Sequence, residues 1–343
     1  MSTVFRVVLT GDQEVTVPPG GTGSDASGVG TVVFDSEAVA ASYSFDIQGF
    51  DFGPITGTPQ TPSPLDDVTR THFHNAAEGV NGRIVFGQID ANPALRQDND
   101  DLALSLNADG SLTLSGVWET TDPPANPPFD FATVLGSATA GTAVDLYFNV
   151  HSGEFPGGEI RGQLVAIADD IDDVVIGTVP TGSATGNDTL DGGNRNDAIL
   201  GLAGDDTLTG ANGNDVLDGG GGDDTLTGGN GDDMLFGSFG SDTLMGGKGE
   251  DTLDGGGGDD SLTGGKGPDL FVFHAGFGED TITDLGNGDR IQFDSEVFAT
   301  AQAVLDASEQ VGDDTVITAG TNTVTLLGVQ ASSLQEDDFL ILA

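Results

Sequence analysis

The chain of 343 residues has no cysteine, only nine lysine and arginine residues against 56 aspartate and glutamate residues, and no long apolar run. Without cysteine it can form neither a disulfide framework nor a thiol nucleophile. The formal charge of −47 excludes nucleic acid and anionic membrane as partners on electrostatic grounds and favours cations. The lack of a long apolar run predicts that no segment spans a membrane.

Signatures of several enzyme classes are also missing. The sequence contains no HExxH, which marks one class of zinc protease, and no GxSxG, which marks a nucleophile elbow. We therefore find no protease, lipase or thiol motif and predict a protein that is not an enzyme. No apolar segment long enough for the hydrophobic region of a signal peptide follows Arg6, so we expect no cleavable N-terminal signal peptide.

The chain does contain a nine-residue repeat between Ser183 and Val272, with units such as GGGGDDTLT and GGNGDDMLF. Glycine dominates positions one, two and four. The sixth position is always aspartate: Asp188, Asp197, Asp206, Asp215, Asp224, Asp233, Asp242, Asp251, Asp260 and Asp269. The eighth is always a large apolar residue, from Leu190 to Phe271. A disordered glycine-rich linker is the alternative, but it would need no fixed apolar column, so we infer a true repeat.

The period predicts a parallel β-roll. Glycines allow a six-residue loop to adopt positive φ angles, and the last three residues of each unit suit a short strand with one inward side chain. Two units form one coil, and roughly five coils stacked about 4.8 Å apart give two parallel sheets. The aspartates then form two rows, one from Asp188 to Asp260 and the other from Asp197 to Asp269.

Each row of aspartates requires a cation. Carboxylates about 5 Å apart repel by roughly 1 kcal/mol in water, and by several times more at an effective dielectric near 20. Carboxylate and carbonyl oxygens suit calcium, which accepts about six to eight ligands in flexible geometry. Burial of about ten apolar side chains cannot offset the ordering of some ninety glycine-rich residues. We therefore predict that the ten aspartates bind calcium together with loop carbonyls, and that the stretch is disordered without it.

These units resemble the RTX, or hemolysin-type, calcium-binding nonapeptides of secreted bacterial proteins. The resemblance implies a calcium-bound parallel β-roll and gives the sixth-position aspartates the role of calcium ligands. The pattern departs from the family at Ser183, Ala184, Arg195, Ser238 and Pro268. Calcium is therefore least expected between the first few units and at the last one.

Residues 1–166 predict an antiparallel β-sandwich. Alternating runs such as VFRVVL, GRIVFGQI and AVDLYFNV are separated by clusters of glycine, proline, asparagine and aspartate. The segments THFHNAAEGVNGRIVF and LYFNVHSGEFPGGEIRGQL resemble the CHRD, or chordin-type, domain family. The resemblance implies an extracellular β-domain without a defined activity. We expect it to act as a structural module or to bind an extracellular protein.

Three histidines, His72, His74 and His151, lie in those two segments. His72 and His74 are two residues apart on an expected strand, so their side chains project from one face. If His151 converges with them, the three imidazoles could hold Zn²⁺ or Cu²⁺ with an open position. The alternative is hydrogen bonding at strand ends, with partners among Glu78, Glu159 and Arg161.

Residues 167–182 are predicted to be an acidic linker in which Val174 to Ile176 can pack onto the first coil. Residues 273–343 are predicted to form a small β-rich cap with one helix over residues 297–310, and His274 is expected to be structural. GEDTITDLGNGDRIQF and QEDDFLILA resemble the C-terminal region of serralysin-type proteins exported by type I secretion. The resemblance implies an uncleaved signal for the type I secretion machinery, and a cap without a targeting role is the alternative.

Together these features predict a secreted calcium-binding protein of the extracellular space. Charge repulsion should keep residues 183–272 expanded in a cell poor in free calcium, and calcium outside should condense them. Two alternatives stay open. One is a secreted metalloenzyme that uses the three histidines, and the other is a surface or matrix component that self-associates through calcium bridges.

Overall fold

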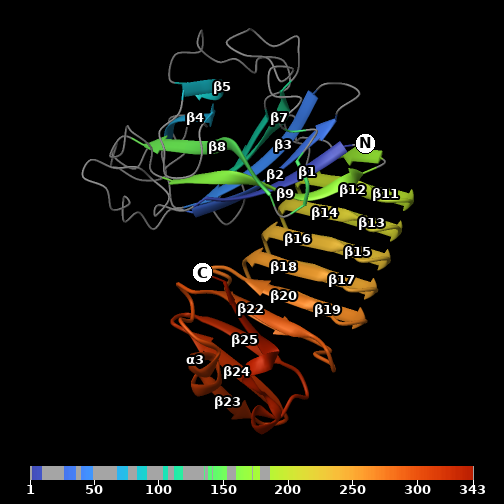
Figure 1. Ribbon diagram of the computed structural model, residues 1–343, viewed down its shortest axis with the longest axis vertical. Coiled ribbons are helices and arrows are strands. Elements are labelled where there is room, and N and C mark those ends of the chain that lie inside the picture. Colours follow the sequence, from blue (N-terminus) through green and yellow to red (C-terminus); the bar gives the residue numbers. More distant parts are fainter. Residues whose placement is uncertain are drawn as a thin grey trace. The chain divides into compact units, whose positions relative to one another are not determined.

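The computed structural model describes residues 2–9, 27–35, 40–48, 68–75, 83–90, 103–106, 112–118, 135, 138–140, 142–152, 160–171, 173–177 and 186–342. The chain divides into two compact units, Met1–Asp172 and Asp173–Ala343. Strands are the main elements among the described residues of both units, as Figure 1 shows, so the predicted all-β class is confirmed.

The N-terminal unit is one continuous antiparallel sheet of nine strands in the order β5-β4-β8-β9-β1-β2-β3-β7-β6. The strands are β1 (Ser2–Leu9), β2 (Ser27–Asp35), β3 (Ala40–Gln48), β4 (Val68–Asn75), β5 (Arg83–Asp90), β6 (Ala103–Leu106), β7 (Leu112–Trp118), β8 (Ala143–Ser152) and β9 (Ile160–Ile171). The buried aromatic side chains Phe5, Tyr43 and Phe45 lie on the central strands β1 and β3. The antiparallel arrangement predicted for this part of the chain is therefore confirmed.

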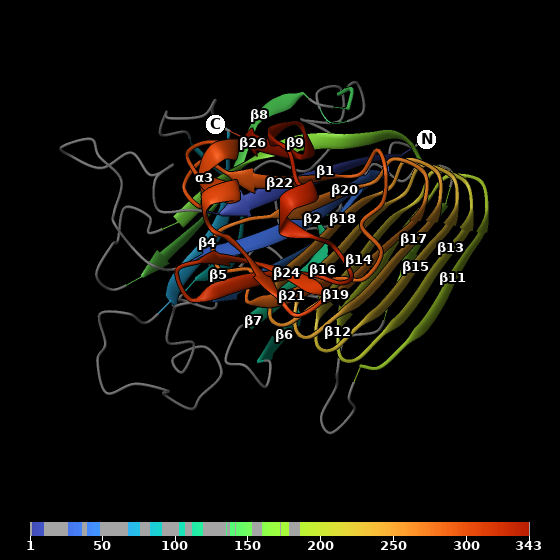
Figure 2. The same cartoon turned by 90° about the horizontal axis from the view of Figure 1, so that it is seen from below.

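The C-terminal unit is a β-roll with two sheets, whose coils lie one behind another in Figure 2. The first sheet is parallel throughout and contains β10 (Asp173–Ile176), β12 (Asp197–Ala203), β14 (Val216–Gly221), β16 (Met234–Phe239), β18 (Thr252–Gly257), β20 (Leu270–Phe273), β22 (Arg290–Asp294) and β26 (Phe339–Leu342). Its first strand, β10, lies in the segment predicted as a linker. Val175 there pairs with Ile199 of the first coil.

The second sheet begins with seven parallel strands, β11 (Thr189–Asn194), β13 (Thr207–Asn212), β15 (Thr225–Asn230), β17 (Thr243–Lys248), β19 (Ser261–Lys266), β21 (Glu279–Ile282) and β25 (Asn322–Leu326). Two antiparallel strands complete it, β24 (Asp314–Ala319) and β23 (Ser308–Val311). The predicted parallel β-roll is thus confirmed.

The strands of the roll are longer than the sequence predicts. Strands such as β13 and β15 have six residues, because each continues through the first three positions of the next unit. Pairing is kept on both sides of the first position: Thr209 pairs with Thr227 and Ala211 with Gly229. The prediction of a six-residue loop and a three-residue strand was therefore wrong, and the turn is confined to positions four to six.

One side chain from each unit fills the interior of the roll. The eighth-position residues from Ile199 to Phe271 are 0% exposed and belong to a single apolar cluster that continues into the cap. In β15 burial alternates from Thr225 to Gly229, with Leu226 and Gly228 buried. In β12, β14 and β16 the residues beside the eighth position are buried as well, apart from Met234. The apolar column predicted at the eighth position is confirmed from Ile199 to Phe271.

The cap extends the same core. Four phenylalanines pack with ring centroids 5.0 to 6.1 Å apart: Phe273, Phe277, Phe293 and Phe298. The cap also contains helix α3 (Ala301–Asp306) and two short 3-10 helices, η4 (Ala331–Ser333) and η5 (Glu336–Asp338). Within the described part of the chain, no helix has the length and apolarity needed to cross a membrane.

The helix predicted over residues 297–310 is shorter than expected. Thr300 caps α3 by accepting a hydrogen bond from the backbone N–H of Ala303. The residues after the helix, Ser308–Val311, form β23 and pair with β24. Strand pairing in the cap therefore overrides local helix propensity at this end.

Position two of the repeat gives a test of backbone strain. Ala211 has a φ of 79°, a left-handed conformation that costs a non-glycine residue about 1–2 kcal/mol. Ala211→Gly removes that strain. Glycine also makes the unfolded chain more flexible, which lowers the free energy of unfolding by about 0.4–1 kcal/mol, so we expect a net rise in the free energy of unfolding of about 0.5–1 kcal/mol. Scanning calorimetry in excess calcium should show a higher unfolding midpoint for the roll.

The matched variant is Gly229→Ala, at the same position one coil further. A Cβ on Gly229 would overlap the carbonyl oxygen of Ala211, so this substitution should lower the midpoint. A lower midpoint for Ala211→Gly would contradict the assignment of strain to position two.

Candidate metal centre

The sixth-position aspartates are stacked in two rows, one on each edge of the roll. Within a row, Oδ1 of each aspartate after the first accepts a hydrogen bond from the backbone N–H of the aspartate one coil earlier, at 2.7 to 3.0 Å. One row contains Asp188, Asp206, Asp224, Asp242 and Asp260, and the other contains Asp197, Asp215, Asp233, Asp251 and Asp269. The structure therefore brings these carboxylates together in the two rows that the sequence predicts.

The second carboxylate oxygen of most of these aspartates has no donor. Oδ2 is buried and accepts no hydrogen bond from any described residue in Asp206, Asp215, Asp233, Asp242, Asp251, Asp260 and Asp269. These residues are at most 3% exposed. A buried carboxylate oxygen without a hydrogen bond is strongly destabilising unless another group compensates its charge. Each of these oxygens is therefore a candidate metal ligand.

Each of these oxygens faces the first-position glycine of its own unit. A Cβ on Gly228 would overlap Oδ2 of Asp233 and would lie 2.7 Å from the carbonyl oxygen of Gly246, in the next coil. Glycine thus leaves a space that is bordered by a carboxylate oxygen and a backbone carbonyl oxygen. These are the two kinds of donor that calcium takes in proteins, so the residues present fit this ion.

Burial raises the pKa of the carboxyl groups in the rows. The pKa of Asp206, Asp233 and Asp260 rises to about 7, because burial disfavours the charged form more than the backbone hydrogen bond to each favours it. For Asp242, the charges of Asp260 and Asp224 add to burial and raise the pKa well above its ordinary value. The metal-free rows therefore hold protons near neutral pH.

The donor set separates calcium from transition metals. Among the described residues, no group of three or more histidine, aspartate or glutamate side chains is arranged to hold a metal ion. A site in the rows must therefore take most of its ligands from backbone carbonyls. All-oxygen sets of this kind suit calcium, whereas zinc and copper favour imidazole and thiolate ligands.

The side chains of the proposed zinc or copper ligands, His72, His74 and His151, are not among those that the structure describes. The backbone register alone is described: it sets His72 opposite Asn149 and His151 opposite Arg70 on the adjacent strands β4 and β8. Of the alternative hydrogen-bond partners, Glu78 and Glu159 also lie outside the described residues, as does the side chain of Arg161. The transition-metal hypothesis for His72, His74 and His151 stays a prediction.

His274, which the sequence assigns a structural role, bridges two carboxylates. Its Nδ1 lies 2.8 Å from Asp294 Oδ2 and its Nε2 lies 3.4 Å from Asp254 Oδ2. Burial lowers its pKa, but the charges and hydrogen bonds of the two aspartates outweigh burial and raise the pKa to about 10. The protonated imidazole therefore joins the end of β20 to the neighbouring strands β18 and β22.

Both rows continue past the last repeat, which the nine-residue pattern does not predict. Oδ1 of Asp280 accepts the N–H of Asp260 at 2.9 Å, and Oδ1 of Asp289 accepts the N–H of Asp269 at 3.0 Å. The spacing is 20 residues in place of 18, because two residues are inserted after the last unit. The signal that could have found them is the return of the repeat in a shifted register, with glycine, aspartate and an apolar residue at Gly276, Gly278, Asp280 and Ile282.

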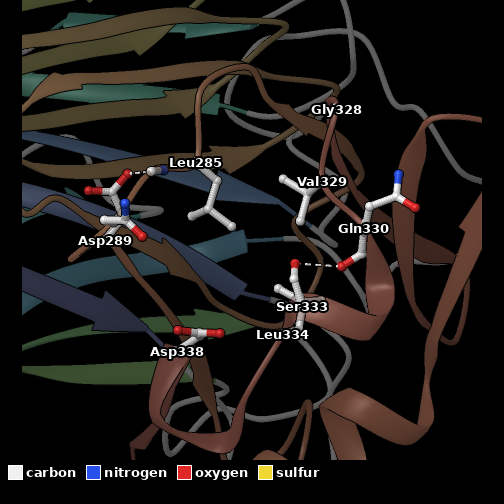
Figure 3. Close-up of a pocket in the computed structure, with 10 residues that line it drawn as sticks. Leu285, Asp289, Gly328, Val329, Gln330, Ser333, Leu334 and Asp338 are labelled. Carbon is white, nitrogen blue, oxygen red and sulfur yellow. Dashed lines mark hydrogen bonds between the residues drawn. The ribbon is translucent and has the colours of Figure 1, made fainter.

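Asp289 also lines a hollow of about 450 Å³ in the cap (Figure 3). Its Oδ2 accepts the N–H of Gly286 at 2.7 Å. Asp338, another lining residue, accepts the N–H of Gln335 at 2.8 Å. Both carboxylates are thus engaged by the backbone of the cap itself, and we do not regard this hollow as the metal centre.

Comparison with known proteins agrees with this division of the chain. The CHRD domain family matches residues 5–164, and the RTX calcium-binding nonapeptide repeat matches in four copies, over residues 184–217, 200–235, 209–244 and 236–271. No curated protein matches the chain significantly.

Two similar solved structures come from bacteria. The crystal structure of the extracellular lipase LipA from Serratia marcescens is 24% identical over 46% of this chain, with a TM-score of 0.29, and the match spans 38% of the lipase chain. The solution structure of a subunit of the Azotobacter vinelandii mannuronan C5-epimerase is 25% identical over 48% of this chain and 82% of that chain, with a TM-score of 0.22. The family matches and the described strands together identify the chain as a CHRD domain followed by a β-roll of RTX calcium-binding nonapeptide repeats.

Proposed function

We propose that this is a secreted, non-enzymatic calcium-binding protein whose repeats fold on calcium after export. The observation that carries the proposal is the row of buried Oδ2 atoms, each beside a glycine and without a hydrogen bond from the described residues. The ligands in this proposal are the ten sixth-position aspartates, together with backbone carbonyl oxygens of the same loops. Bound calcium would supply the positive charge that the rows lack.

The size of the effect supports folding on calcium. A site adds about 1.4 kcal/mol to stability when free calcium is about ten times its dissociation constant. About eight such sites, between neighbouring loops of the two rows, would add about 11 kcal/mol, which equals the entire stability of an ordinary domain. Without that contribution, the apolar column of one side chain per unit is too small to order the repeat.

Export by type I secretion is part of the proposal. It is supported by the resemblance of the C-terminal region to serralysin-type proteins. The residues that carry this resemblance form β21, β22 and β26, which pair with the roll. A secretion signal there would be accessible only before the roll folds, which agrees with folding after export.

The CHRD domain is proposed to be the structural or interaction module of the secreted protein. In this arrangement the roll responds to calcium and the CHRD domain contacts an extracellular protein. Self-association through calcium bridges is the competing arrangement, and light scattering with and without calcium distinguishes the two.

Adjacent aspartates give a sharp test of the calcium ligands. Asp233 is buried with Oδ2 lacking a donor, whereas Asp232 is exposed and accepts the N–H of Glu250 at 2.9 Å. Asp233→Asn should therefore remove about one calcium ion per chain and raise the calcium concentration needed for folding several-fold. Native mass spectrometry gives the count, and far-UV circular dichroism gives the midpoint.

Asp232→Asn is the matched control, because it removes the same charge one residue away and leaves an acceptor oxygen in place. We expect it to bind as many calcium ions as the unchanged protein. Equal counts for both variants would reject the sixth-position aspartates as ligands.

The raised pKa values predict how pH affects the metal-free protein. Between the ordinary aspartate pKa of 3.8 and the folded value of about 7 for Asp206, Asp233 and Asp260, the folded roll binds protons that the unfolded chain has released. This stabilisation is fully present below the unfolded pKa and is lost as pH rises through the folded pKa.

We therefore expect the calcium-free protein to show more β-structure by circular dichroism at about pH 5 than at about pH 8. In excess calcium the signal should change little over the same range, because the ion takes the place of the protons. Loss of β-structure on acidification of the calcium-free protein would contradict the proton-binding role of these carboxyls.

A further inference from the structure

We propose that the calcium row on one edge of the roll extends beyond the nonapeptide repeats to a site at Asp280, whereas the other edge ends at Asp289 without a metal. This inference rests on the proposed calcium function of the repeats. It adds a calcium ligand that lies outside the residues matched by the two families. It also makes one edge of the roll bind calcium further toward the C-terminus than the other.

Asp280 shares the burial and the backbone hydrogen bonds of the aspartates in the repeats, although Ala275 stands in place of the first-position glycine. It is 1% exposed, and its Oδ1 accepts the N–H of Asp260 at 2.9 Å. The N–H of Thr281 bonds the carbonyl oxygen of Asp260 at 2.8 Å, as the N–H of Thr243 bonds that of Asp224 at 2.9 Å within the repeats. The insertion before this loop has therefore left the backbone frame of the site intact.

The glycines of this loop also keep their conformations. Gly276 and Gly278 have φ angles of 88° and 91°, like the glycines at positions two and four of the repeat. A Cβ on Gly278 would overlap the carbonyl oxygen of Gly258, one coil earlier, just as a Cβ on Gly258 would overlap that of Gly240. At Gly278 the loop thus stacks on the last repeat as the repeats stack on one another, whereas a Cβ on Gly276 would meet no atom within 4 Å.

The second oxygen of Asp280 carries the argument for a ligand. Its Oδ2 is buried and has no hydrogen-bond partner among the described residues. Burial, followed by the charge of Asp260, raises the pKa of Asp280 to about 9. A buried carboxylate oxygen without a hydrogen bond is strongly destabilising unless another group compensates its charge. A cation with oxygen ligands satisfies it.

Asp289 differs from Asp280 in the contacts of its Oδ2 atom. Its Oδ1 accepts the N–H of Asp269 at 3.0 Å. Its Oδ2 accepts the N–H of Gly286 at 2.7 Å, the bond drawn at Asp289 in Figure 3. Both oxygens are therefore used by backbone donors. This edge of the roll ends in a hydrogen-bonded turn that needs no cation.

The row through Asp280 ends in the cap. The next strand on this edge is β25, and its residue opposite Asp280 is Val324, which has no carboxylate. Because β21 lies between β19 of the last repeat coil and β25 of the cap, a site at Asp280 lies where repeat and cap meet. Packing of the cap strands against the roll should thus depend on calcium at this edge.

The experiment compares Asp280→Asn with Asp289→Asn in the full chain. Each variant removes one carboxylate of a row and keeps an oxygen that can accept the Oδ1 hydrogen bond. Native mass spectrometry in saturating calcium should show one ion fewer for Asp280→Asn and an unchanged number for Asp289→Asn. An unchanged number for Asp280→Asn, or an equal loss in both variants, would overturn the proposal.

A calcium titration followed by circular dichroism covers the case in which Asp280→Asn folds poorly. If Asp280 is a ligand, the calcium midpoint should rise several-fold and added calcium should restore the fold. If Asp280 is only a buried acid, its neutral replacement removes a desolvation cost, and an equal or lower midpoint would then overturn the proposal. Failure of the proposed function itself looks different, because the unchanged protein would then bind no calcium.

Discussion

The structure of the roll depends on the different contacts that the two oxygens of a sixth-position carboxylate make. One oxygen is fixed by a backbone N–H of the neighbouring coil, which places the carboxylate in the stack and buries it. In Asp206, Asp215, Asp233, Asp242, Asp251, Asp260 and Asp269 the other oxygen lies beside the first-position glycine and accepts no hydrogen bond from the described residues. The hydrogen bond that builds the stack thus also leaves a second oxygen whose charge a cation can compensate, which is why the proposed function couples folding to metal binding.

Much of this arrangement is encoded in the period of the sequence. Because two units make one coil, a constant aspartate and a constant apolar residue per unit are sufficient to predict two carboxylate rows and one buried column. The column from Ile199 to Phe271 is buried as predicted. The donor deficit at Oδ2 could not be predicted, since it depends on which oxygen accepts the N–H and on how closely the carboxylate approaches Gly228 and its equivalents.

The differences between sequence and structure have local physical causes. Strands are six residues long because pairing skips the first-position residue and resumes beyond it, which no propensity reveals. Asp280 and Asp289 were missed because two inserted residues shift the period, while the stacking of coils tolerates the insertion. The short α3 reflects pairing of β23 with β24, a contact that forms only in the folded cap. The side chains of His72, His74 and His151 are outside the described residues, so the transition-metal site stays a prediction from the sequence.

The ladder of hydrogen bonds along each row has a polarity. The N–H of Asp188 is satisfied by Asp206, that of Asp206 by Asp224, and so on toward the C-terminus. In this ladder the earlier coil always donates the N–H and the following coil always supplies the accepting carboxylate. Within this ladder, removing coils from the N-terminal end leaves every remaining aspartate N–H satisfied, whereas removing the cap leaves the N–H groups of Asp260 and Asp269 without their acceptors Asp280 and Asp289. The sixth-position aspartates therefore present acceptors to the preceding coil, whereas the fifth-position side chains present acceptors to the following coil, as Asp205 does to the N–H of Asp223.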